Sequence, residues 1–421
     1  FLGGGSADYG RGVAVDKQGN IYVVGEFFSS DFLGDNTPTS GSTDAIILKL
    51  NPAGTELLYG FYLGGTGGDE GLAVAVNAAG EAYMIVDPGE EFPTQNAPIA
   101  QEPESGDAVL VKFDAAGTQV FSTYLGFNVT NSHTGNVIDI GPNGEVYITG
   151  QSYDAYHRLG QVAIVQTNPA TGAIVHQFDR GDAYADTQGA ALAVDSAGIV
   201  YVAGQVFDRF GTEFATTPDA FQTKCPRKAK LGDDRDCDED AFIMTLNADL
   251  TLRYASFLGG VGSDDASGID VDKNGNIVVV GAASSPDFPT KNALIPTCPE
   301  DPSLQLCSYD GFVTKLNPAS GLVYSTYLTS GQPEAMTFVT DVAIDNAGNA
   351  FVYGFTSGET MPIKNAIQPA IGPGLCIGGF NRNCFDVFIT ELAPDGTLAF
   401  GTYLGGKFDE YTGSIAVDSS G

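Results

Sequence analysis

The stretch Val13–Gly25 reads V-A-V-D-K-Q-G-N-I-Y-V-V-G, and it decides the fold. Two β-rich runs flank an Asp-x-x-Gly segment. Asp can accept hydrogen bonds from turn amides and Gly tolerates the left-handed backbone, so the pattern predicts a β-hairpin. It returns as I-D-V-D-K-N-G-N-I-V-V-V-G at Ile269–Gly281 and as V-A-I-D-N-A-G-N-A-F-V-Y-G at Val342–Gly354. The turn glycine recurs at intervals of 54 to 77 residues, which indicates an internal repeat.

A second hairpin follows the first in each unit. Its first copy begins with D-A-I-I-L-K-L-N at Asp44–Asn51, turns at Pro-Ala-Gly, and ends with Tyr-Leu-Gly-Gly at Tyr62–Gly65. The third unit is degenerate, because Gln161 stands where the other units have the first Asp of this hairpin. Each unit therefore predicts four short strands, named a, b, c and d in chain order.

Four strands per unit without helical periodicity predict an all-β fold, a β-propeller of four-stranded blades. A single sheet cannot bury both faces alone, and stacking around an axis lets neighbouring blades cover each other. The residue two positions before the turn is small or acidic in every unit, as at Asp139 and Asp270. Only strands near the axis need such residues, so strand a should be innermost. We expect these two carboxylates to line a central channel, either as a satisfied polar lining or as a cation site.

The blade count leaves two main readings open. The units lie near 12–65, 71–126, 136–179, 190–260, 267–330 and 339–406, and a partial unit covers 413–421. We interpret residues 1–421 as a single propeller domain belonging to a longer chain. We expect six complete blades and an incomplete seventh in a seven-bladed ring. A six-bladed ring with a surplus strand, or an open array that pairs with neighbouring chains, is the alternative.

Four short motifs carry a family resemblance: Y-L-G-G, I-A-V-D-x-x-G-N, F-P-T-x-N-A and D-A-F-V-x-K-L-N-P-x-G. The third appears at Phe92–Ala97 and again at Phe288–Ala293. The chain resembles the repeats of bacterial secreted β-propeller proteins known as SBBP repeats, over essentially its whole length and most weakly at 126–180. The resemblance implies the propeller fold and export, and it brings no catalytic residues.

Charge narrows the classes of partner. The chain has 19 Lys and Arg residues against 52 Asp and Glu residues, a formal net charge of −33. Such a surface repels nucleic acid and anionic lipid, so we expect neither as a partner. No apolar run reaches the roughly 18 residues of a membrane helix, so we expect no membrane insertion by this segment.

The six cysteines form three close pairs in the predicted b–c loops of the last three units. Their spacings differ from the C-x-x-C knuckles of metal sites. We therefore predict local disulfides, which persist in oxidising compartments and favour an extracellular or cell-surface location. The alternative is free thiols in a cytosolic protein. The predicted pairs are Cys225–Cys237, Cys298–Cys307 and Cys376–Cys384.

The predicted b–c loops are long, whereas the a–b and c–d turns are tight. We therefore expect one face to carry the binding function, the alternative being loops that only shield the ring. The fourth b–c loop is rich in aspartate over Asp233–Asp240. Alternate carboxylates at Asp234, Asp236 and Asp238 suit Ca²⁺, although the loop lacks the EF-hand pattern and also fits a solvated acidic loop.

These features favour an exported, non-enzymatic module that binds a protein or glycan ligand through its acidic loop face. A subunit of an extracellular filament or surface layer is a further reading. The alternative class is a carbohydrate-active lyase or hydrolase, which needs two carboxylates about 5–10 Å apart in a cleft. All three histidines, His133, His157 and His176, fall in the third unit or just before it, without a nucleophile motif. We therefore predict no catalytic residues and no cofactor other than Ca²⁺.

Overall fold

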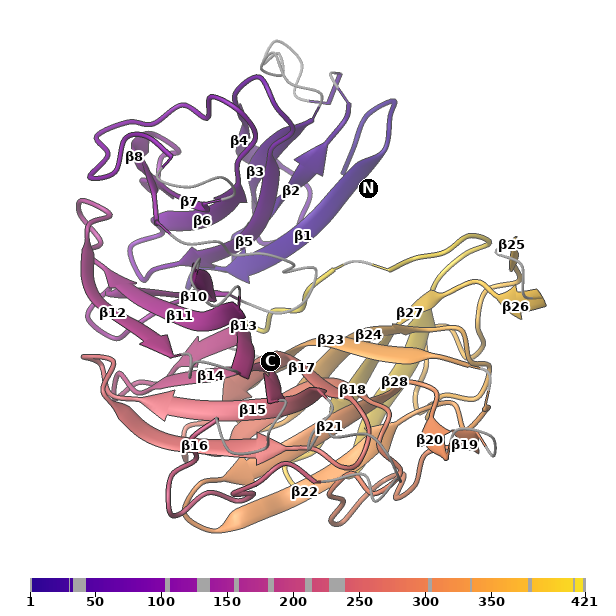
Figure 1. The fold of residues 1–421 in the computed structure, drawn as a ribbon. Helices are drawn as coiled ribbons and strands as arrows, with labels where there is room; N and C mark the ends of the chain where they lie inside the picture. The colour runs from indigo at the N-terminus through magenta and orange to yellow at the C-terminus, as the bar shows by residue number, and fades with distance from the viewer. Residues whose placement is uncertain are drawn as a thin grey trace.

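The computed structural model describes residues 2–29, 31–32, 43–102, 107–126, 137–154, 159–180, 185–208, 214–226, 239–301, 305–333, 335–377, 381–411 and 413–418. Within these ranges the regular elements are strands, and six four-stranded antiparallel sheets surround a common axis (Figure 1). The predicted all-β propeller is confirmed. The number of four-stranded blades is six, as in the six-bladed alternative. No helix in the described ranges has the length and apolarity needed to cross a membrane.

Each blade pairs its strands in chain order. The strands are β1 (Asp8–Val15), β2 (Ile21–Phe27), β3 (Asp44–Leu50) and β4 (Leu57–Leu63) in blade 1; β5 (Glu70–Val76), β6 (Ala82–Asp87), β7 (Val109–Phe113) and β8 (Gln119–Tyr124) in blade 2; β9 (Ile138–Ile140), β10 (Val146–Asp154), β11 (Leu159–Thr167) and β12 (Ile174–Arg180) in blade 3; β13 (Ala185–Val194), β14 (Val200–Asp208), β15 (Glu239–Leu246) and β16 (Leu252–Leu258) in blade 4; β17 (Asp264–Val271), β18 (Ile277–Ala283), β21 (Asp310–Asn317) and β22 (Gly321–Leu328) in blade 5; and β23 (Thr337–Ile344), β24 (Ala350–Thr356), β27 (Asp386–Leu392) and β28 (Leu398–Leu404) in blade 6. Two small hairpins, β19 (Glu300–Asp301) with β20 (Leu306–Cys307) and β25 (Leu375–Ile377) with β26 (Asn381–Asn383), lie in the b–c loops of blades 5 and 6.

The a–b turns form as the repeat pattern predicts. In blade 1, Asp16 Oδ1 accepts hydrogen bonds from the backbone amides of Gln18 and Asn20, both at 2.9 Å. Gly19 closes the turn with a φ of 81°, in the left-handed region that favours glycine. The Asp-x-x-Gly spacing therefore recurs in the chain because one turn geometry is used repeatedly.

The inner strands share a β-bulge on the half of the strand that follows the d–a loop. In five of the six inner strands one extra residue interrupts the register. The opposing b-strand glycine leaves room for this bulge: a Cβ on Gly281 would lie 1.8 Å from the carbonyl oxygen of Asp265. A bulge changes the direction in which a side chain points, so the bulged residues are candidates for functional roles. The inserted residues are Arg11, Leu72, Ala190, Ser267 and Thr340.

Neighbouring blades are joined by apolar packing and by buried polar links. Tyr22 and Val24 of blade 1 share a buried cluster with Val74 and Met84 of blade 2. Near the a–b turns, Lys315 Nζ lies 3.0 Å from Asp272 Oδ2 and donates to the Gly348 carbonyl of the next blade at 3.1 Å. These contacts join blade 1 to blade 2 and blade 5 to blade 6.

The segment Ser414–Val417 was expected to begin a seventh blade, but it belongs to none of the six four-stranded sheets. It runs toward the axis between β23 and β1 (Figure 1). The Ile415 amide donates to Asp341 Oδ2 of blade 6 at 2.9 Å, and the Val13 amide donates to Ser414 Oγ at 3.0 Å. The segment thus links the inner strands of the sixth and first blades.

Candidate binding site on the loop face

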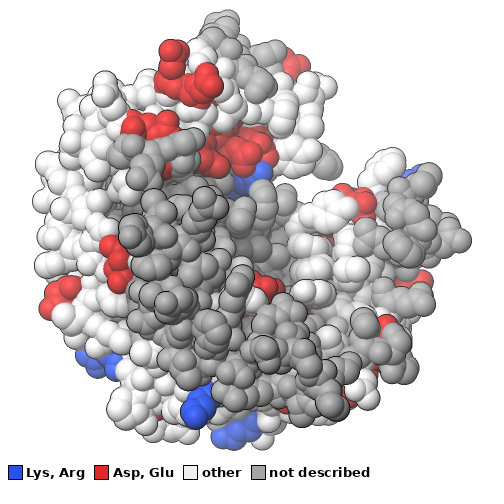
Figure 2. Space-filling model, viewed as in Figure 1, with Lys and Arg blue, Asp and Glu red and all other residues white. Residues whose placement is uncertain are grey.

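The b–c and d–a connections leave the blades on one face, called the loop face here, and the tight a–b and c–d turns lie on the other, the turn face. Figure 2 shows acidic side chains gathered over the blades formed by β1–β8, with a basic group beside them. The described members of this region come from the inner and second strands of blades 1 and 2. We name Arg11, Glu26, Glu70 and Asp87 the carboxylate cluster.

Arg11 is the centre of the carboxylate cluster. It is the bulged residue of β1, and its Nη2 atom lies 2.5 Å from Glu26 Oε1 and 2.9 Å from Glu70 Oε2. The Arg11 side chain is 8% exposed and that of Glu26 is 10% exposed, whereas Glu70 is 35% exposed. One guanidinium therefore bridges β2 of blade 1 and β5 of blade 2 in a nearly dry environment.

Asp87 adds a third carboxyl group. It ends β6 directly opposite Glu70, which begins β5, and like charges in such a cross-strand pair are destabilising. Burial raises the pKa of Asp87 to about 6, with the charges of Glu70 and Asp69 adding to the effect and Arg11 opposing it. Burial also raises the pKa of Glu26, against the pull of Arg11. Three carboxyl groups thus share one guanidinium, which leaves excess negative charge at the loop-face end of the inner strands.

This geometry favours binding over acid–base catalysis. Glu26 and Glu70 contact the same nitrogen of Arg11, so the guanidinium occupies the space between their carboxylates. In a glycosidase the scissile bond lies between the two carboxyl groups. Glu70 and Asp87 are both partly exposed where they pair across β5 and β6.

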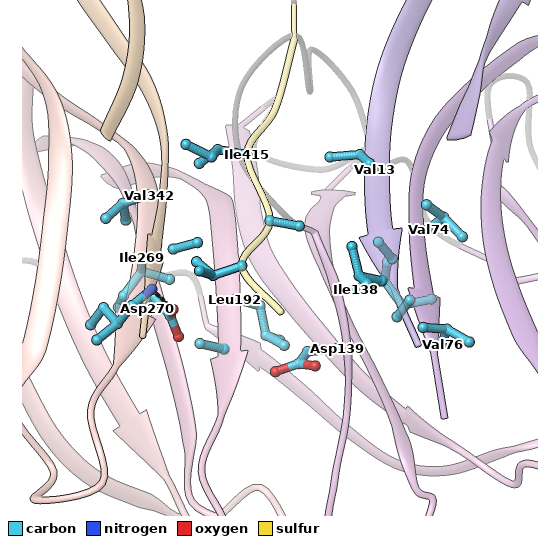
Figure 3. A pocket seen from close by; sticks show the side chains of 18 residues that line it. Val13, Val74, Val76, Ile138, Asp139, Leu192, Ile269, Asp270, Val342 and Ile415 are labelled. Atoms are coloured by element: carbon cyan, nitrogen blue, oxygen red, sulfur yellow. Dashed lines mark hydrogen bonds between the residues drawn. The ribbon is translucent and has the colours of Figure 1, made fainter. Parts of the chain in front are cut away.

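The central channel forms a cavity of about 240 Å³ lined by the inner strands of all six blades and by Ile415–Val417 (Figure 3). Asp139 and Asp270 lie in it, as expected. Asp139 accepts the amides of Ile140 and Val194, both at 2.7 Å. Asp270 accepts those of Val271 at 2.7 Å and Ile344 at 2.6 Å.

Each of these two carboxylates therefore joins its own inner strand to that of the next blade. Burial raises the pKa of Asp139 to about 6 and that of Asp270 to about 7. Each carboxylate accepts two backbone amides, so both side chains can be explained as a structural lining of the channel.

Several d–a acidic residues of the expected binding face serve the fold. Asp8, Asp69 and Asp264 each accept the amide of the glycine four residues earlier, at 2.7, 3.0 and 2.6 Å. These side chains cap the end of strand d. Fewer acidic groups on this face are therefore free to bind a ligand than the acidic composition suggests.

The carboxylate cluster was not predicted from the sequence. A signal was present at the bulge position, where blade 1 has Arg11 and the other bulged inner strands have Leu, Ala, Ser or Thr. The predicted Ca²⁺ ligands Asp234, Asp236 and Asp238 lie outside the described residues, as do His133 and His157.

Blade 6 replaces carboxylates with aromatic rings. Phe338 and Phe355 are paired on β23 and β24 at the register that Tyr9 and Glu26 occupy in blade 1. Their ring centroids are 5.1 Å apart, and they pack with Phe385 and the partly exposed Tyr411. The loop face is thus acidic over blades 1 and 2 and aromatic at blade 6.

A disulfide joins Cys298 and Cys307, with a Cα–Cα distance of 5.9 Å. It joins the segment just before β19 to the end of β20, so it closes the base of the small hairpin in the fifth b–c loop. Cys225 and Cys384 are disulfide-bonded as well. The side chains of Cys237 and Cys376 are not among the described ones, so the other two pairings stay predictions.

The fold and its repeated hairpins define a β-propeller of four-stranded blades. The family model described as the SBBP β-propeller repeat matches residues 2–26, which include β1 and most of β2. These residues of the chain are therefore similar to an SBBP repeat, in agreement with the resemblance of the sequence motifs. A comparison with curated proteins found no match.

Solved structures with similar folds are distant. A protein of unknown function from Bacteroides caccae is 11% identical, with a TM-score of 0.39 over 85% of this chain and 90% of that one. The β-propeller domain of the Trilobed protease from Pyrococcus furiosus is 8% identical, with a TM-score of 0.41 over 93% of each chain. Puromycin hydrolase is 11% identical, with a TM-score of 0.46 over 98% of this chain and 49% of that one. At these levels the similarities carry no argument about function.

Proposed function

We propose that this protein is an exported, non-enzymatic propeller that binds a partner through its acidic loop face. The observation that carries the proposal is the carboxylate cluster, where Arg11 neutralises only part of the charge of Glu26, Glu70 and Asp87. A rigid scaffold with a charged patch near its axis is a common arrangement for recognition on loops and strand ends. The SBBP repeat and the Cys298–Cys307 disulfide support export.

The charge of the site indicates the chemistry of the partner. Lysine or arginine side chains of a protein would complement Glu70 and Asp87, and a net charge of −33 would attract such a partner at long range. The aromatic rings at blade 6 would add contact area for the same partner or for a sugar ring. We therefore place a basic protein surface first and a glycan second.

An array of immobilised ligands tests the proposal. Lysine-rich and arginine-rich peptides should retain the protein, and acidic peptides of equal length should not. Retention should fall as salt rises from 50 to 300 mM, because surface charges are screened at about 8–10 Å near physiological ionic strength. Equal retention on acidic and basic peptides would contradict the proposal.

A carbohydrate-active enzyme is the second candidate, supported by the facing carboxyl groups of Glu70 and Asp87, because burial raises the pKa of Asp87 to about 6, as a general acid needs. Incubation with acidic and neutral polysaccharides, followed by a reducing-end assay, distinguishes the two. Product formation that Glu70→Gln abolishes would favour the enzyme. The Ca²⁺ site at Asp234, Asp236 and Asp238 remains part of the proposal, and Asp234→Asn with Asp236→Asn should remove a Ca²⁺-dependent rise in melting temperature.

A further inference from the structure

Pairs of carboxyl groups converge on single glycines at the loop-face end of the blades. In blade 1, a Cβ on Gly64 would lie 2.7 Å from Asp44 Oδ1 and 2.3 Å from Asp69 Oδ2. In blade 4, a Cβ on Gly259 would lie 2.2 Å from Asp240 Oδ1 and 2.9 Å from Asp264 Oδ2. The glycine ending strand d therefore makes room for two carboxylates, one from the start of strand c and one from the d–a loop.

Blade 6 has the same arrangement with a glutamate as the second member. The Asp386 carboxylate packs against Gly405, with its Oδ1 atom 2.6 Å from the position of a Cβ there. Glu410 Oε2 accepts the amide of the next glycine, Gly406, at 3.2 Å. The charge of Asp386 contributes to raising the pKa of Glu410, after burial, so the two groups are electrostatic neighbours.

The first member of the pair in blade 6 has an unused oxygen in a dry place. Asp386 is 0% exposed, and its Oδ2 atom accepts the Gly372 amide at 2.6 Å. Its buried Oδ1 atom has no hydrogen-bond partner. An orphaned carboxylate oxygen is costly in a protein interior and calls for a ligand such as a water molecule or an ion.

Charge balance points in the same direction. In blades 1 and 4 hydrogen bonds already satisfy the second carboxylate, because Asp69 accepts two backbone amides and Asp264 accepts two as well. In blade 6, burial raises the pKa of Asp386 and that of Glu410. Two carboxylates in one buried place cannot both ionise without a counter-charge. Among the described residues, the ion pairs formed by Lys and Arg include neither Asp386 nor Glu410.

We propose that the pair Asp386–Glu410 is a divalent-cation site of blade 6. Carboxylate and backbone carbonyl oxygens are the hard ligands that Ca²⁺ prefers, and Ca²⁺ accepts an irregular set that water completes. This site is separate from the aspartate-rich loop at Asp234–Asp238 and does not depend on the proposed partner binding. Its effect would be to fix the loop after β28 to the start of β27.

Terbium luminescence in the full-length chain tests this proposal, because Tb³⁺ takes Ca²⁺ sites and is sensitised by nearby tyrosine. The chain has 18 Tyr and no Trp, and Tyr403 is buried in the same blade as Asp386. Wild-type protein freed of metal should give a saturable signal that Ca²⁺ displaces. Asp386→Asn combined with Glu410→Gln should bind one Tb³⁺ fewer. The charge-matched control is Glu391→Gln combined with Glu56→Gln, which also replaces two carboxylates and should bind as many ions as wild type.

The competing explanation is that Asp386 and Glu410 share a proton. In that case wild-type protein shows no Ca²⁺-displaceable signal, and acid alone raises its melting temperature, which would overturn the proposal. An unchanged number of bound ions in the double variant would overturn it as well. If the double variant does not fold, Glu410→Gln alone gives the same test, because Glu410 is only half-buried and lies in a loop.

Discussion

Arg11 Nη2 lies 2.9 Å from Glu70 Oε2, so a bulged residue of the first blade is held by an ion pair to the inner strand of the second. The bulged residue of blade 5 also contacts the next blade, because Ser267 Oγ donates a hydrogen bond to the Val339 carbonyl of blade 6 at 2.9 Å. The repeated bulge thus aims one side chain at the next blade. In blade 1 that side chain carries a charge and gathers carboxylates around it.

Removing the guanidinium should destabilise the protein. Arg11→Met leaves Glu26, which is 10% exposed, next to Glu70 without a counter-charge. Losing one partner of a buried ion pair typically costs about 3–5 kcal/mol. Urea unfolding should show a loss of that order, and Arg11→Met with Glu26→Gln should recover much of it. A single variant as stable as wild type would show that the pair contributes no stability.

The b-strand glycine opposite the bulge should not tolerate a side chain. Gly281→Ala would place a Cβ 1.8 Å from the carbonyl oxygen of Asp265, so the backbone of blade 5 must shift. Overpacking of this kind costs about 1–3 kcal/mol. Gly10→Ala is the control, because its Cβ would meet nothing closer than a Val23 methyl at 3.9 Å. Equal unfolding midpoints for the two variants would contradict the role assigned to the bulge.

The channel carboxylates should give the protein a pH-dependent stability. Burial raises the pKa of Asp270 from 3.8 to about 7. A raised folded-state pKa means that the stabilising contribution is full below about pH 4 and is lost as the pH rises through about 7. Asp270→Asn should therefore flatten the fall in melting temperature between pH 4 and pH 7. An unchanged slope in that window would mean that Asp270 titrates normally in the folded protein.

The disulfide of the fifth b–c loop should stabilise the ring locally. Replacing both Cys298 and Cys307 by Ala frees a loop that the bond now closes across a sequence separation of 9. The unfolding free energy should fall by roughly 2–3 kcal/mol, mainly because the unfolded chain gains freedom. Denaturant titration of the oxidised variant against wild type measures this loss. Equal midpoints would show that the bond constrains a region that unfolds separately.

The blade architecture could be predicted from the sequence because a similar short turn motif recurs in the repeats. The Asp16 turn and its counterparts depend on residues within five positions of one another, so their pattern is readable without tertiary information. The inner position of strand a was also readable, because Asp139 and Asp270 mark positions where only small or acidic residues occur. Both lie in the channel.

The carboxylate cluster could not be predicted from the sequence in the same way. Arg11 meets Glu26 within its blade and Glu70 across a blade boundary, and the latter contact depends on how consecutive sheets are placed around the axis. The bulge that aims Arg11 has no signature of its own in a single strand. Likewise, the structural role of Asp8 and Asp69 has no compositional signal, because the glycine amides from which they accept hydrogen bonds are backbone groups.

The affinity of a lysine-rich peptide for charge-matched variants tests the central claim most directly. Titration calorimetry at 50 mM salt should show binding by wild type and at least tenfold weaker binding by Glu70→Gln with Asp87→Asn, which removes two charges from the carboxylate cluster. The control is Glu56→Gln with Glu391→Gln, which removes two charges near the turn face and should bind like wild type. Equal weakening in both double variants would show that net charge, and not the carboxylate cluster on the loop face, attracts the ligand.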